Sequence, residues 1–138
     1  MILTILALVF TTTSNPARLN FEVATVGNVT QKPLYVEQYV RTYFSDIPIM
    51  AKIAECESRF RHFDVDGNIL RGEKNKRDIG VMQINEEFHL DTALDMNIDL
   101  YTLGGNLLYA RKLYEKKGTE PWKYSKKCWG GKALALAK

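Results

Sequence analysis

A polar segment, residues 58–79, lies between stretches of helical apolar spacing and restricts the fold more than any other feature of the chain. It is rich in Asp, Gly, Asn, Arg and Lys, and it lacks the apolar periodicity that a helix needs. Within it, Asp66-Gly67 is a turn signal between two short extended pieces, 63–65 and 68–70, which predicts a small β-hairpin. The chain is therefore expected to fold as helices around one irregular, partly extended segment.

Helical patterns cover most of the chain on either side of this segment. Apolar residues recur at helical spacing, Pro48 suits the first turn of a helix, and Gly118 is a stop signal. Gly104 and Gly105 weaken the start of the last long helix, unless another backbone approaches closely there. The pattern predicts a mainly α fold with a minor β element, in the α+β class. The predicted helices cover residues 34–44, 48–57, 86–96 and 102–117.

The N-terminal residues predict export. Ile2 to Phe10 is an almost unbroken apolar run followed by small polar residues, and it is too short to span a bilayer unaided. This run predicts a signal peptide or hydrophobic anchor over residues 1–14, with a buried N-terminal strand as the alternative. The protein is then expected to be secreted, periplasmic or associated with the cell envelope. The other predicted segments are a linker, 15–33, a single domain, 34–129, and a C-terminal tail, 130–138.

Charge and cysteine content exclude some classes of function. The formal net charge is +3, and the basic residues are scattered among 16 acids. The sequence therefore lacks the clustered basic face that is typical of nucleic-acid-binding proteins. The sequence also lacks the pattern of a basic amphipathic helix, which would indicate binding to a membrane surface. Two cysteines in an exported chain predict a disulfide, and the alternative is two buried free thiols. Only His62 and His89 could join Cys56 and Cys128 at a metal, so the sequence predicts no zinc site.

Glu57 is the candidate catalytic acid. It follows Ile53 by four residues, so it lies at the edge of the apolar stripe of the predicted helix, in its last turn. Desolvation and the negative end of the helix dipole both favour the protonated carboxyl and raise its pKa. A carboxyl that stays protonated can donate a proton to a leaving glycosidic oxygen. The alternative is a glutamate that bends out to solvent.

Two motifs around this glutamate resemble a known enzyme family. Residues 53–60 (IAECESRF) resemble the "ES-x-F" signature of lytic transglycosylases of the soluble type, and residues 80–85 (GVMQIN) resemble the family's "G-L-M-Q-I" segment. Residues 106–114 resemble a third family segment, "N-x-x-x-A-x-x-L", and the likeness covers roughly residues 47–129. These enzymes share the lysozyme-like fold with goose-type lysozymes. The resemblance therefore implies that fold, a peptidoglycan glycan strand as substrate, and a monomer without cofactor or metal.

Carried over by position, the resemblance assigns roles to the residues of both motifs. Glu57 is the acid, and Ser58 is the neighbour that orients it or contacts the substrate. Gly80 allows close backbone approach, and Met82 packs under the cleft, with plain core packing as the alternative for Met82. Gln83 offers its amide to a sugar N-acetyl group.

The chain also departs from the family pattern. It lacks the "A-Y-N-A-G" motif that supplies a cleft tyrosine, and Tyr124 is the candidate replacement. Tyr109 falls near a helix tyrosine that lines the cleft in relatives, with core packing as the alternative. Asn85 stands where goose-type lysozymes carry an acidic residue that positions the attacking water. A lone carboxyl, Glu57, therefore favours the non-hydrolytic reaction. The alternatives are a hydrolytic lysozyme with Asp78 as second carboxylate, or a wall-binding module without turnover.

A second resemblance concerns the cysteines. Resuscitation-promoting factors, small secreted relatives of the same fold, carry a Cys immediately before the catalytic Glu and pair it with a Cys in a Trp-rich C-terminal segment. Cys56 and Cys128 occupy these places, the latter within residues 122–129 (WKYSKKCW). The implied bridge closes a loop of about 70 residues, which is worth about 4 kcal/mol in the loop-entropy model.

Overall fold

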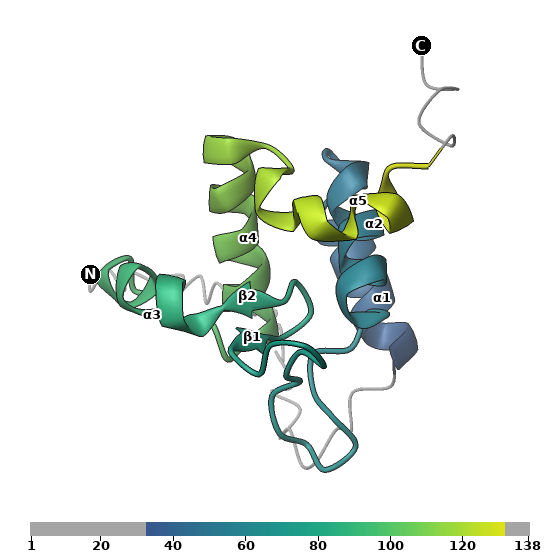
Figure 1. Ribbon diagram of the computed structural model, residues 1–138. Helices are drawn as coiled ribbons and strands as arrows, with labels where there is room; N and C mark the ends of the chain where they lie inside the picture. The colour runs from purple at the N-terminus through teal and green to yellow at the C-terminus, as the bar shows by residue number, and fades with distance from the viewer. Residues whose placement is uncertain (1–32, 132–138) are drawn as a thin grey trace, which may run out of the picture.

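The computed structural model describes residues 33–131, which fold into a mostly helical domain with a small two-stranded antiparallel sheet (Figure 1). The predicted signal or anchor, nearly all of the predicted linker, and the tail beyond Gly131 lie outside the described residues. The elements in chain order are α1 (Pro33–Tyr43), α2 (Pro48–Ser58), β1 (Asp78–Ile79), β2 (Ile84–Asn85), α3 (Glu86–Asp95), α4 (Leu103–Lys117), the 3-10 helix η1 (Glu120–Ser125) and α5 (Lys126–Trp129).

The helices form where the apolar spacing predicts them. Pro48 occupies the first turn of α2, as predicted, and the buried face of this helix repeats at three- and four-residue spacing from Met50 through Ile53 and Ala54 to Ser58. After Ser58 the chain leaves the helix through Arg59, which takes a left-handed conformation at φ 55°. Predicted ends and observed ends differ by a residue or two.

Helix α4 is bounded by the residues that the sequence predicts. The Thr102 side-chain oxygen accepts a hydrogen bond from the Gly105 backbone N–H at 3.0 Å, which caps the N-terminus, and Gly118 ends the helix at φ 58°. A Cβ on Gly105 would collide with the Asp99 carbonyl, whereas one on Gly104 would meet only the Tyr39 hydroxyl at 4.0 Å. The close approach that could explain the two glycines therefore exists at Gly105 alone.

The polar segment forms less regular structure than predicted. The Asp66-Gly67 turn exists, with Gly67 at φ 82° and a single antiparallel bridge between Phe63 and Ile69, but no strand extends from it. The strands are instead β1 and β2, which pair Asp78 with Asn85 and Ile79 with Ile84. The predicted hairpin over 63–70 thus exists as a turn with one antiparallel bridge, and the two-stranded sheet, which the sequence did not predict, lies further along the chain.

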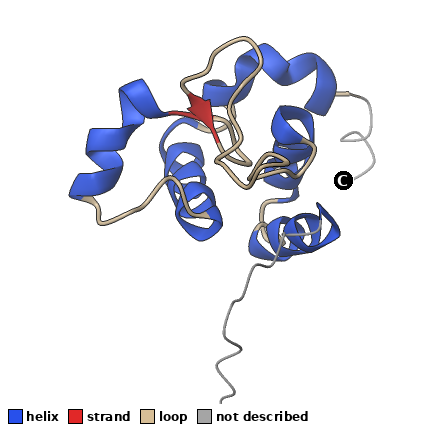
Figure 2. Cartoon of the chain, turned by 90° about the horizontal axis from the view of Figure 1, so that it is seen from below, coloured by secondary structure: helices blue, strands red, loops and turns tan. Residues whose placement is uncertain are grey.

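The C-terminal segment joins the two sides of the domain. Figure 1 shows η1 and α5 crossing from the end of α4 to α2, and both pack on α2. The predicted disulfide is confirmed: Cys56 on α2 is bonded to Cys128 on α5. Figure 2 shows helices around the small sheet and the long loop, while α3 extends away from the rest. None of the helices between residues 33 and 131 is long and apolar enough to cross a membrane.

Candidate active site

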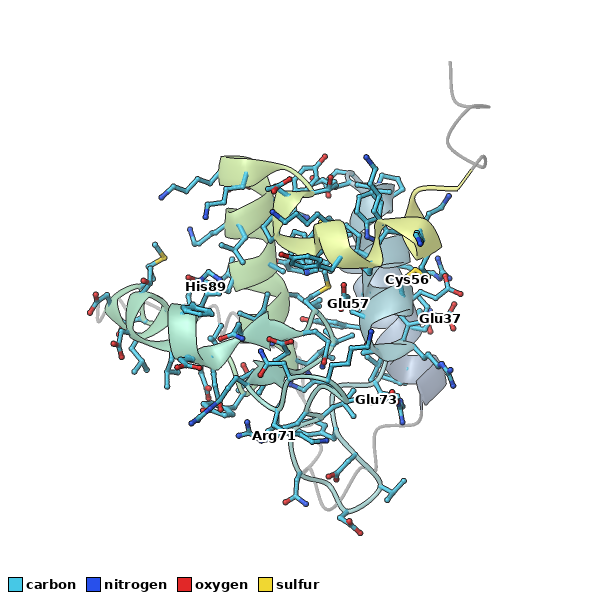
Figure 3. The ribbon with its side chains drawn as sticks, viewed as in Figure 1. Glu37, Cys56, Glu57, Arg71, Glu73 and His89 are labelled. Atoms are coloured by element: carbon cyan, nitrogen blue, oxygen red, sulfur yellow. A yellow bond between two sulfur atoms is a disulfide. The ribbon has the colours of Figure 1, made fainter. Side chains whose placement is uncertain are left out.

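Glu57 lies in the last turn of α2, next to the disulfide (Figure 3). The residue is half-buried, and its Oε1 accepts a hydrogen bond from the Ser125 hydroxyl at 2.6 Å. Burial raises the pKa of the Glu57 carboxyl; the Ser125 hydroxyl opposes this rise, and the negative charge of Asp78 adds to it. The upward direction predicted from the sequence is confirmed, so the site favours a protonated carboxyl.

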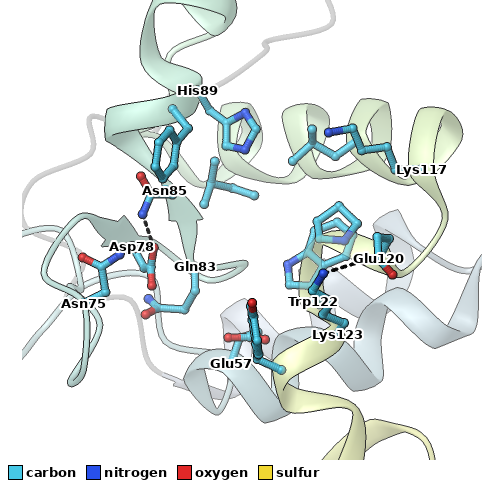
Figure 4. A pocket seen from close by; sticks show the side chains of 15 residues that line it. Glu57, Asn75, Asp78, Gln83, Asn85, His89, Lys117, Glu120, Trp122 and Lys123 are labelled. Carbon is cyan, nitrogen blue, oxygen red and sulfur yellow. Dashed lines mark hydrogen bonds and ion pairs between the residues drawn. The ribbon is translucent and has the colours of Figure 1, made fainter.

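A cleft of about 650 Å³ opens in front of this carboxyl. Its size falls within the range of pockets that bind small molecules or a few sugar units. Figure 4 shows Asp78 and Asn85 on one side, Trp122 on the other, and Glu57 between them. The cleft is lined by Glu57, Asn75, Asp78, Gln83, Ile84, Asn85, Phe88, His89, Leu113, Lys117, Glu120, Pro121, Trp122, Lys123 and Tyr124.

One side of the cleft presents amides and a carboxylate from the β1–β2 hairpin. The Asp78 Oδ1 accepts hydrogen bonds from the Asn85 Nδ2 at 2.7 Å and the Asn75 Nδ2 at 3.2 Å. The Asn85 Oδ1 is buried and has no hydrogen-bond partner within the described part of the chain. Because the Asp78 carboxylate fixes which end of the Asn85 amide faces it, this orphaned oxygen is an acceptor that a ligand hydroxyl or N–H could satisfy.

The turn between the strands has the tight backbone approach expected at Gly80. This glycine has φ 72°, and a Cβ on it would lie 2.6 Å from the Asn106 Nδ2 and 2.8 Å from the His62 Cε1. The approach therefore serves packing inside the protein. Gln83 lines the cleft at φ 49° and donates from Nε2 to the Gly80 carbonyl at 2.9 Å, so its amide is already half engaged.

The other side of the cleft is built by η1. The Trp122 ring is buried, and its Nε1–H donates to the Met82 carbonyl at 3.0 Å, which ties this wall to the opposite one. Met82 itself is fully buried in the core and does not line the cleft. Tyr124 lies at the rim and is 92% exposed. Tyr124, the predicted replacement for the family's cleft tyrosine, therefore does line the cleft.

Four residues that the resemblance assigned to the site, Ser58, Gly80, Met82 and Tyr109, do not line the cleft. Ser58 is buried, and its hydroxyl donates to the Ala54 carbonyl at 3.0 Å, so it does not orient Glu57. Tyr109 is only 3% exposed and does not line the cleft; its hydroxyl contacts the His89 Nδ1 at 3.0 Å. The corrections for Ser58 and Tyr109 follow from helix geometry, which turns these side chains toward the core.

Sequence reasoning missed Ser125 and Phe88. The signal for Ser125 was present, because a bridge from Cys128 to Cys56 brings the residue three positions earlier close to Glu57. Phe88 lies in the first turn of α3, lines the cleft and is 75% exposed. An apolar residue at that place in a weakly amphipathic helix gives no sequence signal of a cleft.

Between residues 33 and 131, no group of three or more His, Cys, Asp or Glu side chains is placed to hold a metal ion. Comparisons of this chain with models of protein families, with curated proteins and with solved structures found no match. The family relationship therefore stays a prediction from the sequence motifs, and the chemistry of the site has to be argued from its own residues.

Proposed function

We propose that this protein is a lysozyme-like enzyme that cleaves the β-1,4 bond between N-acetylmuramic acid and N-acetylglucosamine in peptidoglycan, with Glu57 as proton donor. One observation carries the proposal: a half-buried carboxyl with a raised pKa faces a cleft of about 650 Å³ lined with amides and exposed aromatic rings. A raised pKa shifts the carboxyl toward the protonated form that a general acid needs. A substrate in the cell wall also agrees with the predicted export.

The proposed reaction uses the same carboxyl twice. Glu57 first protonates the glycosidic oxygen, which leaves with the N-acetylglucosamine unit. The resulting carboxylate then takes the proton from the 6-hydroxyl of the muramic acid, whose oxygen attacks C1 and closes a 1,6-anhydro ring. The attacking oxygen belongs to the same sugar, so proximity replaces a positioned water. Glu57 ends the cycle protonated.

The polar groups of the hairpin wall supply recognition in this proposal. The orphaned Asn85 Oδ1 can accept from a sugar hydroxyl or an N-acetyl N–H, and Gln83 lines the same cleft. The exposed rings of Phe88 and Tyr124, on opposite elements of the cleft, offer flat apolar surfaces to sugar faces.

Hydrolysis is the second candidate, and Asp78 is the observation that favours it. Asp78 lines the same cleft as Glu57 and acts on its pKa through charge. Its carboxylate is held by two amide donors, from Asn75 and Asn85. A fixed carboxylate facing an acid is the arrangement that activates a water or stabilises the glycosyl cation in hydrolytic glycosidases.

Digestion of purified peptidoglycan, with mass analysis of the products, tests both reactions. We expect 1,6-anhydro ends from the wild type and a loss of roughly 10²- to 10⁴-fold in rate for Glu57→Gln. Glu55→Gln is the matched control, because Glu55 is exposed and lies 3.8 Å from Arg41, away from the cleft. Equal cutting by wild type and Glu57→Gln would refute the proposal.

Asp78→Asn separates the two reactions. It should leave the anhydro product in place if Glu57 acts alone. Ends that carry one additional water in the wild type, lost in Asp78→Asn, would establish hydrolysis instead. Binding to the wall without any cutting by the wild type would identify a wall-binding module.

A further inference from the structure

The Ser125 hydroxyl is surrounded by three polar groups. Its Oγ lies 2.6 Å from the Glu57 Oε1, 3.0 Å from the Trp122 carbonyl oxygen and 2.9 Å from the Trp129 Nε1. A serine hydroxyl has one proton to donate and two lone pairs that accept. It therefore cannot donate to Glu57 and to the Trp122 carbonyl at the same time.

These contacts define two complete hydrogen-bond arrangements. When Glu57 is ionised, Ser125 donates to the carboxylate and accepts from the Trp129 Nε1–H. When Glu57 is protonated, its carboxyl proton is donated to the Ser125 Oγ, and the serine proton turns to the Trp122 carbonyl. The Trp129 Nε1–H donates to the Ser125 Oγ in both arrangements. The change from one arrangement to the other therefore moves only protons. A fixed backbone N–H at this place could only donate, so it could not accept the proton of the neutral carboxyl.

The surroundings of Ser125 hold its oxygen still. Trp122 and Trp129 are both buried, and the Trp129 Nε1–H also reaches the Trp122 carbonyl at 3.2 Å. The bond between Cys128 and Cys56 joins α5 to α2 one residue before Glu57. The position of the hydroxyl relative to the carboxyl is thus set by the bridge and by two packed indole rings.

We propose that Ser125 is a positioning residue that holds the Glu57 carboxyl in one place through both halves of the reaction, by exchanging the roles of donor and acceptor. Its part in the reaction rests on the proposed function, in which Glu57 is first acid and then base. The exchange itself concerns only this chain and can be measured without substrate.

Titration of the Glu57 carboxyl carbon by NMR in ¹³C-glutamate-labelled protein tests the exchange, with Glu57→Gln to assign the signal. In Ser125→Ala the ionised form loses a charge-assisted hydrogen bond and the protonated form loses a weaker neutral one, so the pKa of Glu57 should rise by about one unit. Ser125→Thr keeps the hydroxyl and should restore the wild-type pKa. Ser58→Ala is the matched control, because it removes a hydroxyl next to Glu57 in the chain that points to Ala54. A pKa that stays or falls in Ser125→Ala overturns the inference.

The pH profile of glycan cleavage tests the part in the reaction. The first step needs protonated Glu57, so activity falls as pH rises through its pKa. In Ser125→Ala this alkaline limb should move to higher pH. The maximal rate should fall roughly tenfold, because the carboxyl is held less precisely. Ser125→Thr should restore both the limb and the rate. An unmoved limb would overturn the inference. The expected pKa rise, together with a wild type that cleaves no glycan, would instead overturn the proposed function and leave the exchange standing.

Discussion

The two walls of the cleft are held together by different physical means. The wall that carries the acid, made of α2, η1 and α5, is fixed by the Cys56–Cys128 bridge and by the burial of Trp122 and Trp129. The hairpin wall, residues 60–85, has only two short strands, and buried polar side chains add hydrogen bonds to its backbone groups. The difference shows two ways to build a rigid site in a small domain, one covalent and apolar, the other polar.

Buried polar side chains replace regular strand pairing in the hairpin wall. The Asn106 amide accepts from the Met82 N–H at 3.0 Å and donates to the Ile79 and Leu100 carbonyls at 3.1 and 3.2 Å. The His62 Nδ1 accepts from the Val81 N–H, and its Nε2 lies 3.0 Å from a backbone carbonyl, which fixes the neutral Nε2–H tautomer. These bonds satisfy backbone groups that no ladder reaches.

Removal of the bridge should have the largest effect and break the acid-bearing wall. The bridge joins residues 72 positions apart. We expect the Cys56→Ser/Cys128→Ser variant to lose about 4 kcal/mol of unfolding free energy, because the unfolded chain regains the entropy that the closed loop removes. Urea denaturation measures this loss, with the reduced wild type as a check that should match the double variant. A loss below about 1 kcal/mol would show that indole packing alone holds this wall.

Loss of the Asn106 amide should have the next largest effect and break the hairpin wall. Asn106→Ala removes the hydrogen bonds to the Met82 N–H and to the Ile79 and Leu100 carbonyls, so we expect a loss of about 3 kcal/mol in unfolding free energy. Asn68→Ala, an exposed asparagine in the same wall, is the control and should change stability by less than about 0.5 kcal/mol. Equal stabilities of the two variants would mean that water satisfies the freed groups.

The two walls should respond oppositely to pH, which is the smallest of these effects. The folded pKa of Glu57 is raised above its ordinary value of 4.5, so the folded chain binds this proton more tightly and stability falls as pH rises above 4.5. At the start of α3, directly after the hairpin wall, hydrogen bonds from Arg71 in that wall first, then from Tyr101, lower the pKa of Glu86. Its contribution is present above 4.5 and is lost as pH falls through the lowered pKa.

Denaturation at pH 7 and pH 4 separates these contributions. Glu57→Gln should be more stable than the wild type at pH 7, by no more than about 1 kcal/mol because solvent still reaches the carboxyl, and should lose this advantage at pH 4. Glu86→Gln should be less stable than the wild type at pH 7 and approach it at lower pH. Parallel pH curves for the two variants would contradict the comparison.

Local patterns predicted most of the helical framework. The apolar spacing of residues 48–57 and 102–117, with Pro48 and Gly118 at the ends, is enough to define α2 and α4 to within a residue or two. The C-terminal segment was different: its residues show no clear period, and η1 and α5 form there because the two indole rings are buried against α2 and α4. The structure of this segment therefore depends on tertiary burial and not on local sequence pattern.

The candidate site divides in the same way. The sequence by itself indicated Glu57 as the candidate acid and its place at the edge of an apolar helix face, because both depend on residues within one turn of it. It also predicted the upward direction of the Glu57 pKa, although tertiary burial and the charge of Asp78 produce that rise. Only the tertiary structure decided its partners. Ser125 is 68 positions away in the chain and Asp78 lies on a separate element, and neither Ser58 nor Tyr109 faces the cleft. Long-range packing and one covalent bridge set those distances, and no local period encodes them.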